Sequence, residues 1–359
     1  MQRHAPASRR DVGAFHGREA RHLLTWGCGA LVLACAVLSL GIGPTGLSLG
    51  SLPRAVLGAW TGSPGPETLV LLNLRLPRVL LGVFVGAGLA VSGAVMQGLF
   101  RNPLADPGLI GVSSGAALAA VATIALGNGL AAPLMRAFGV YALPLAAFFG
   151  GLATTVVLMA VARRSGTLLT GTLLLAGVAI AALCGSLTGI LAYASDDREL
   201  RDLTLWSMGS LAGASWPKVV AVLPFTLLLL ALVPRLTRAL NGFLLGEAEA
   251  FHLGIDVERA KRLCVLLTAA ATGAAVAVAG IVGFVGIVVP HLMRLLAGPD
   301  HRFVLPGSAA LGASLVLLAD IFARMAVRPA ELPLGLVLAI LGAPVFLHLV
   351  VRRGAGGGA

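Results

Sequence analysis

Long apolar runs, each ended by a short polar or glycine- and proline-rich stretch, fill most of the chain. A run of about 20 mostly apolar residues is long enough to cross a bilayer as a helix. Such runs predict ten membrane-spanning helices, with expected bounds 23–42, 77–99, 107–126, 140–162, 168–193, 217–238, 262–281, 283–297, 305–326 and 333–351. The eighth is short and glycines crowd its entry, so we do not expect it to cross the bilayer alone.

The composition supports an all-α integral membrane protein. Of the 359 residues, 58% are hydrophobic and only 11% are charged, and the mean hydropathy is +0.95. A soluble protein of this size needs more polar surface, and the alternating ten-residue strands of a membrane β-barrel are absent. The formal charge of +11 comes mostly from arginines between apolar runs. This pattern excludes a nucleic-acid-binding domain and fits charges that orient helices in a bilayer.

The distribution of positive charge predicts which side each loop faces. With residues 1–22 in the cytoplasm and ten spans, 17 Lys and Arg residues fall in cytoplasmic segments and 9 in external ones. Cytoplasmic loops carry such an excess, so we expect both termini in the cytoplasm. Arg75 and Arg78 then lie outside, although most positive charges lie on the cytoplasmic side.

The chain is expected to form one membrane domain, residues 23–353, between a disordered basic tail (1–22) and a flexible tail (354–359). Helices 2–5 and 7–10 predict two inverted repeats around helix 6, although the sequence similarity between them is weak. Small residues four apart, Gly82/Gly86 and Gly185/Gly189, predict close helix packing.

Two polar segments predict local structure outside the spans. In "LFRNPLADPGLIGVSSG" (99–115), Asp106 is a natural N-cap and Pro107 can open helix 3. The external stretch 194–213 predicts a short surface helix. Its Arg198 and Arg201 either attract an anionic substrate at the outer mouth or pair with neighbouring acids. In helix 9, Asp320 and Arg324 are spaced as an i,i+4 ion pair; a proton-relay role for Asp320 is the alternative.

No catalytic motif is found, and neither lysine follows a glycine as a Walker A loop requires. ATP and Mg²⁺, if used, therefore bind another subunit, and we expect no cofactor or metal on this chain. The cytoplasmic insertion 241–262 carries an apolar stripe that includes Leu244 and Phe251, with Glu247 beside it. It lacks the basic face of a membrane-surface helix, which favours a short helix that fits a groove on a soluble partner.

Several long blocks together resemble one family. The blocks "LRLPRVLLGVFVGAGLAVSGAVMQGLFRNPLADPGLIGVSSGAA", "TLLLAGVAI", "GIVGFVGIVVPHLMRLLAGPDHRFVLPGSAALGASLVLLADIFAR" and "ELPLGLVLAILGAPVFLHLV" closely resemble the permease subunits of type II ABC importers for cobalamin, ferric siderophores and haem. The resemblance runs in colinear order from about residue 24 to residue 353.

The resemblance implies a homodimer in the bacterial inner membrane, two cytoplasmic ATPase subunits and a periplasmic binding protein. The substrate path would lie between the two copies, lined by helix 5. The resemblance places binding-protein docking at Arg75, Arg78 and Arg324, and a cytoplasmic gate at Thr170, Gly171 and Thr172. It places ATPase coupling in 241–262, with Leu244, Glu247, Phe251, Leu253 and Gly254.

The segment 196–216 looks more like the haem branch of the family than the cobalamin branch, and Arg198 and Arg201 could bind haem propionates. We therefore expect haem as the substrate, with a ferric siderophore and then cobalamin as alternatives. Two other functions stay open at this point: a secondary transporter driven by an ion gradient, and a receptor or scaffold without transport.

Overall fold

The computed structural model describes residues 18–44, 47–62, 65–127, 129–164, 167–327 and 329–356. These residues form a bundle of helices with one pair of two-residue strands, β1 (Arg163–Arg164) and β2 (Thr167–Leu168). The all-α membrane fold is therefore confirmed. Most of the predicted tails lies outside the described residues, but 18–22 and 354–356 belong to the first and last helices.

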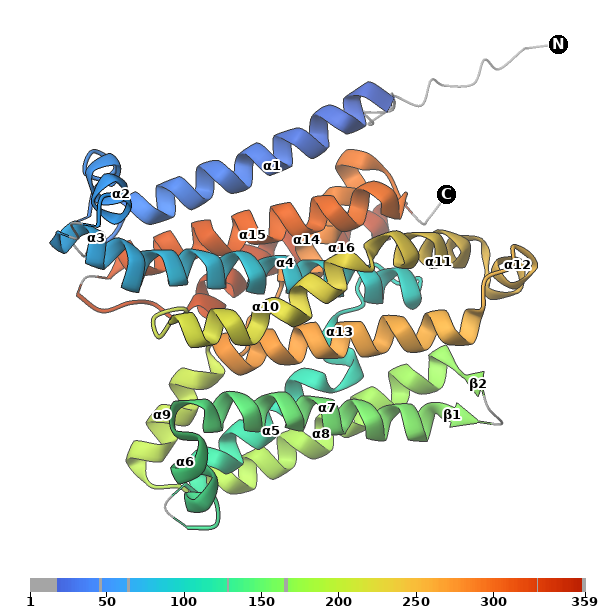
Figure 1. The fold of residues 1–359 in the computed structure, drawn as a ribbon. Coiled ribbons are helices and arrows are strands. Elements are labelled where there is room, and N and C mark those ends of the chain that lie inside the picture. The colour runs from blue at the N-terminus through green and yellow to red at the C-terminus, as the bar shows by residue number, and fades with distance from the viewer. Residues whose placement is uncertain are drawn as a thin grey trace.

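The helices follow one another along the chain with short connections (Figure 1). They are α1 (Arg18–Gly41), α2 (Leu52–Trp60), α3 (Pro66–Val70), α4 (Leu76–Leu99), α5 (Val112–Ala125), α6 (Ala132–Phe138), α7 (Ala142–Ala162), α8 (Thr170–Ala194), α9 (Asp197–Ser207), α10 (Trp216–Ala231), α11 (Val233–Leu245), α12 (Glu247–His252), α13 (Val257–Ala279), α14 (Val285–Ala297), α15 (His301–Ala326) and α16 (Leu334–Gly356). A π-helical turn, Leu71–Arg75, joins α3 to α4.

Each of the ten predicted spans has a helical counterpart. Within the part of the chain that the structure describes, five stretches are long and apolar enough to cross a membrane: 66–99, 132–162, 170–194, 257–279 and 301–326. The bent pair α10–α11 makes a sixth. The other four predicted spans correspond to shorter apolar stretches in α1, α5, α14 and α16. Whether all four cross the bilayer, and whether the two halves are inverted repeats, stays a prediction.

The bundle has two ends with different elements (Figure 1). The start of α1, the end of α16, β1–β2 and α12 lie at one end, which we call the inner end after the predicted topology. The helices α2, α3, α6 and α9 lie at the opposite, outer end. The predicted coupling segment and gate therefore share the inner end, and the predicted docking arginines lie at the outer end.

The core forms around α4, which packs along α15, α13 and α14. Glycine lets these helices approach closely: a Cβ on Gly86 would overlap the carbonyl group of Gly312 in α15, and one on Gly93 would overlap Gly286 in α14. The predicted close packing at Gly82 and Gly86 is confirmed. At Gly185 and Gly189 in α8 it is not, since no described atom lies within 4 Å of a Cβ built there.

Three predicted helices are interrupted. Asp106 is an N-cap, as predicted, because its Oδ1 accepts from the Gly108 N–H at 2.7 Å, but it caps a 3-10 turn, Pro107–Ile110, that left-handed Gly111 ends before α5. The predicted helix 217–238 is bent by 54° between α10 and α11, where Pro234 cannot continue the backbone hydrogen bonds. Helix 283–297 starts only at Val285, after an irregular segment, 280–284.

Candidate functional site

A cluster of charged side chains joins four segments at the outer end. Arg78 forks between two carboxylates: its Nη2 lies 2.9 Å from Asp320 Oδ1 and 2.7 Å from Glu331 Oε2. Arg324 Nε lies 3.1 Å from the other Asp320 oxygen. The predicted Asp320–Arg324 pair is thus confirmed, but it is part of a larger network. Because two arginines hold Asp320, the structure does not favour a proton relay at this residue.

The same network reaches α1 and the loop that follows it. Arg324 Nη2 donates to the Ser39 hydroxyl at 2.9 Å, and Arg75 Nη1 donates to the Ile42 carbonyl at 2.9 Å. Arg75 and Arg324 are each only 2% exposed. In this conformation they do not reach the surface, so docking through all three arginines stays a prediction. Contact of a binding protein with Arg75 or Arg324 would require the cluster to open.

Glu331 completes the cluster and was missed by the sequence reasoning. Its carboxylate accepts two hydrogen bonds from Arg78, which lower the pKa of Glu331 below its ordinary value of 4.5. Its side chain is 27% exposed, compared with 12% for Arg78. No local pattern marks this pair, because the two residues are 253 positions apart.

The two arginines predicted at the outer mouth lie on α9, the surface helix expected from the sequence. A capping box starts this helix: the Asp196 side chain accepts from the Glu199 N–H, and the Glu199 side chain accepts from the Asp196 N–H. Arg198 and Arg201 are exposed and form no ion pair with any described residue. The alternative that neighbouring acids neutralise them is therefore not realised.

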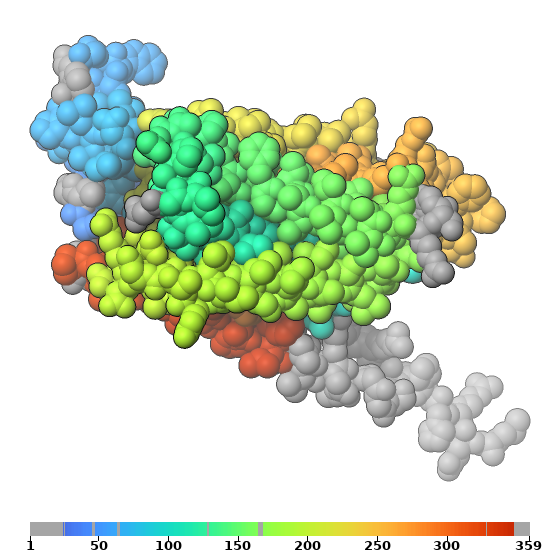
Figure 2. Space-filling model, turned by 90° about the horizontal axis from the view of Figure 1, so that it is seen from below, coloured from blue at the N-terminus to red at the C-terminus, as the bar shows by residue number. Residues whose placement is uncertain are grey.

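The long helix next to this surface, α8, is apolar but largely uncovered. Only 17% of its most apolar window is buried, against 83% for the stretch 66–99 that contains α4. Figure 2 shows the yellow-green side chains of α8 and α9 along one face of the molecule. Glycines without a neighbour on an apolar helix indicate a face that another helix or a substrate approaches closely.

The predicted gate residues stand at the start of α8. Thr170 is the first residue of the helix, and Gly171 and Thr172 follow it in the first turn. A Cβ on Gly171 would meet no described atom within 4 Å. The Thr170 hydroxyl donates to Glu247 Oε1 at 3.0 Å. The structure therefore joins one predicted gate residue directly to one predicted coupling residue.

The predicted coupling segment is not one continuous helix. Gly246, with φ of 126° and ψ of 158°, separates α11 from α12, so Leu244 lies on one helix and Phe251 on the other. Leu244, Phe251 and Leu253 are large apolar residues that remain exposed at the inner end, and Phe251 is 69% exposed. Gly254 follows in the left-handed region with φ of 76°.

Lys261 and Glu258 complete this end and were not predicted as site residues. Lys261 Nζ donates to Glu247 Oε2 at 2.6 Å and to the Leu168 carbonyl at 2.9 Å. The Leu168 N–H donates to Glu258 Oε2 at 2.9 Å. In the sequence Lys261 counts only as one of the cytoplasmic charges, and nothing around it indicates that its side chain is buried.

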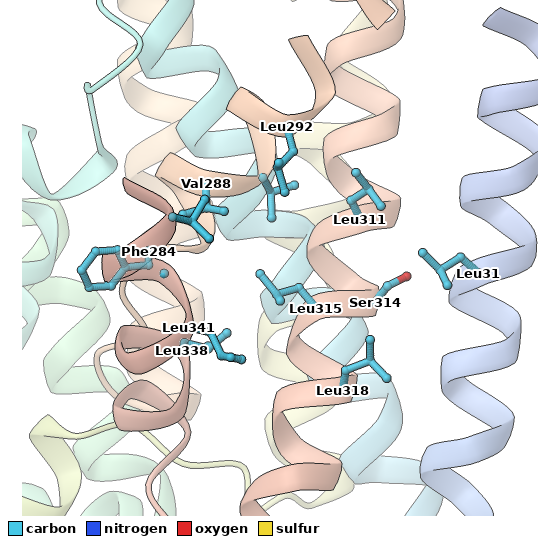
Figure 3. Close-up of a pocket in the computed structure, with 13 residues that line it drawn as sticks. Leu31, Phe284, Val288, Leu292, Leu311, Ser314, Leu315, Leu318, Leu338 and Leu341 are labelled. Carbon is cyan, nitrogen blue, oxygen red and sulfur yellow. The ribbon is translucent and has the colours of Figure 1, made fainter. Parts of the chain in front are cut away.

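An apolar pocket of about 350 Å³ opens between α1, α14, α15 and α16 (Figure 3). Leu31 faces it from α1, Leu315 from α15 and Leu341 from α16, and Ser314 is the one polar residue of its lining. A wall of this kind suits hydrocarbon and offers almost nothing to a charged chelate. We therefore do not assign the substrate path to this pocket.

Comparison with known proteins identifies relatives over nearly the whole chain. The model of the FecCD transport family matches residues 31–352. The hemin transport system permease protein HmuU of Yersinia pestis is 46% identical over 90% of this chain and 95% of its own length. The cobalamin import system permease protein BtuC of Halobacterium salinarum is 45% identical over 81% of this chain and 76% of its own length.

A further relative and a solved structure agree with these matches. The vitamin B12 import system permease protein BtuC of Escherichia coli is 42% identical over 90% of this chain and 93% of its own length. A solved structure of a metal-chelate type ABC transporter in an inward-facing conformation superposes with a TM-score of 0.80. It is 33% identical, and the match covers 92% of this chain and 99% of that one.

Proposed function

This chain belongs to the FecCD transport family, and on that premise we propose that it is the membrane permease of an ATP-driven importer that carries an iron-containing chelate, with haem as the first candidate. The importer would work in the bacterial inner membrane as a homodimer with both termini in the cytoplasm. Two cytoplasmic ATPase subunits would bind ATP and Mg²⁺, and a periplasmic binding protein would deliver the substrate.

The observation that carries this proposal is the uncovered apolar face of α8. A second copy of the chain against this face would bury exposed residues such as Leu183 and Ile190 and use the open sides of Gly185 and Gly189. A path between two copies would then have apolar, glycine-containing walls. Weak contacts of this kind suit a substrate that must also leave.

The exposed apolar residues at the inner end support a soluble partner there. Phe251 and Leu253 would dock into a groove of an ATPase subunit, as an amphipathic helix does. ATP binding on that partner would shift the population between two permease states, to the extent that the ATPase binds them with different affinity.

Haem is proposed on two grounds. The hemin permease relative matches 90% of the chain at 46% identity. Near the outer end of α8, Arg198 and Arg201 are two exposed cations that form no ion pair with any residue that the structure describes. Haem carries two propionates that such cations would hold by charge-assisted hydrogen bonds. The cobalamin permease of H. salinarum is almost as similar at 45%, so the identity values alone do not separate these substrates.

Uptake by the complete importer decides the substrate. The permease is reconstituted with its ATPase and each candidate binding protein, and uptake of haem, a ferric siderophore and cobalamin is compared at equal concentration. We expect haem uptake to dominate, and the double variant R198Q/R201Q to reduce it. Dominant uptake of cobalamin, or haem uptake that the double variant leaves unchanged, would contradict this assignment.

A further inference from the structure

The short helix α12 is held between two glycines whose backbone conformations other residues rarely adopt. Gly246 precedes it with φ of 126°, and Gly254 follows it with φ of 76°. Glycine adopts both conformations without the steric cost of a Cβ. Such positions absorb the backbone rotation when a segment turns as a unit. The six residues of α12 thus have a candidate hinge at each end.

Glu247, the first residue of α12, is linked to the start of α8 through both oxygens of its carboxylate. Glu247 Oε1 accepts from the Thr170 hydroxyl at 3.0 Å, and Glu247 Oε2 accepts from Lys261 Nζ at 2.6 Å. The same ammonium donates to the Leu168 carbonyl at 2.9 Å. Leu168 and Thr170 flank Leu169, the N-cap of α8. The entry of α8 is thus held on both sides of its cap.

Lys261 is the buried member of this hydrogen-bonded group. Its side chain is 4% exposed, whereas that of Glu247 is 40% exposed. It belongs to α13, one of the most deeply buried helices of the bundle. A buried ammonium left without its partners is strongly unfavourable. When Glu247 moves, the side chains and backbone that share these hydrogen bonds must therefore move with it or exchange partners.

We propose that Glu247 and Lys261 are positioning residues that transmit a turn of α12 to the start of α8, where the path opens or closes. This inference rests on the proposed function, in which α12 receives the motion of the ATPase and α8 lines the path. Under this proposal the two residues of α12 have different contacts. The exposed Phe251 is available to the partner, and Glu247 is turned toward Thr170.

The test uses the complete reconstituted importer and measures ATP hydrolysis and substrate uptake in the same vesicles. The variants are E247Q, K261M and the pair T170V and T170S. The matched control is E249Q, which removes the same charge from α12 at an exposed residue that forms no ion pair with any described residue.

We expect E247Q, K261M and T170V to lower the uptake per ATP hydrolysed by about fivefold or more, the loss that corresponds to a coupling free energy of at least 1 kcal/mol. T170S keeps the hydroxyl and should retain the ratio, and E249Q should also retain it. A spin label at position 172 in each copy should show a nucleotide-dependent change of distance in the control and little change in K261M.

The result that would overturn the link is an unchanged ratio and an unchanged distance response in E247Q, K261M and T170V. T170V replaces a hydroxyl by a methyl group of similar size, so it answers the question even if K261M fails to assemble. Failure of the proposed function looks different: the wild-type complex itself would show no uptake that depends on ATP.

Discussion

Removal of the Asp320 charge tests how the outer end is held together. In the wild-type chain this carboxylate accepts hydrogen bonds from Arg78 and forms an ion pair with Arg324, and the side chains of Asp320 and Arg324 are each 2% exposed. The change D320N keeps the shape of the side chain but leaves the two guanidinium groups facing each other. Among the described residues, Glu331 would be the one carboxylate left to compensate them, from a partly exposed position.

The expected loss of stability follows from burial. Removal of one partner of a buried ion pair costs about 3–5 kcal/mol, and because Glu331 still holds Arg78 we expect the lower end, about 3 kcal/mol. E331Q is the control, since it removes a carboxylate that water can reach, and we expect a loss of about 1 kcal/mol. Equilibrium unfolding in mixed detergent micelles measures both variants against the wild type.

A loss for D320N that is equal to or smaller than the loss for E331Q would refute this reasoning. It would mean that water or a rearranged side chain satisfies Arg324 without Asp320. The arginines would then be free to turn outward, and direct docking of a binding protein through Arg75 and Arg324 would become the better account of their position.

Three further predictions concern packing, pH and the exposed helix. G93V places methyl groups where the Gly286 backbone crosses α4, so the folded permease should be lost or strongly destabilised. G29V is the control and should be tolerated, as judged by the midpoint of unfolding in detergent, because no described atom lies within 4 Å of a Cβ built at Gly29 in α1. Hydrogen bonds from Arg78 lower the pKa of Glu331. The free energy of unfolding of the wild type should therefore exceed that of E331Q by a constant amount near neutral pH, and this difference should shrink as the pH falls below about 4.5. A difference that grows on acidification would contradict the pairing. G185C should form an intermolecular disulfide in membranes, detected by non-reducing electrophoresis, and absence of the dimer would contradict a close approach of the two copies at Gly185.

Apolar patterning was sufficient to locate the helices, because lipid and helix-on-helix packing both demand long apolar surfaces. The positions of α7, α8 and α13 agree with the predicted spans within a few residues. The pattern predicted 217–238 as one straight span and could not give the bend between α10 and α11. Pro234, with Arg235 and Arg238 after it, was a usable indication that the apolar run ends there. Nor could it show the irregular segment 280–284, where the chain is glycine-rich but still apolar.

For the candidate sites too, the sequence indicated some residues but not their contacts. Glu247 and Thr170 were each assigned from the family resemblance, yet their contact joins positions 77 residues apart and no local spacing predicts it. Lys261 appears in the sequence as an ordinary cytoplasmic charge, and only the fold shows that it is buried. Side chains that face each other across the bundle depend on tertiary packing, so the sequence marks the residue types and the structure shows the partners.

We propose that this permease moves its substrate with energy from ATP hydrolysed on a partner. The most direct measurement is haem uptake into proteoliposomes that contain the purified permease with its ATPase subunits and binding protein, compared with proteoliposomes of permease alone under an imposed proton or sodium gradient. We predict uptake only in the complete assembly and only with hydrolysable ATP. Uptake by the permease alone, driven by the ion gradient, would contradict the account.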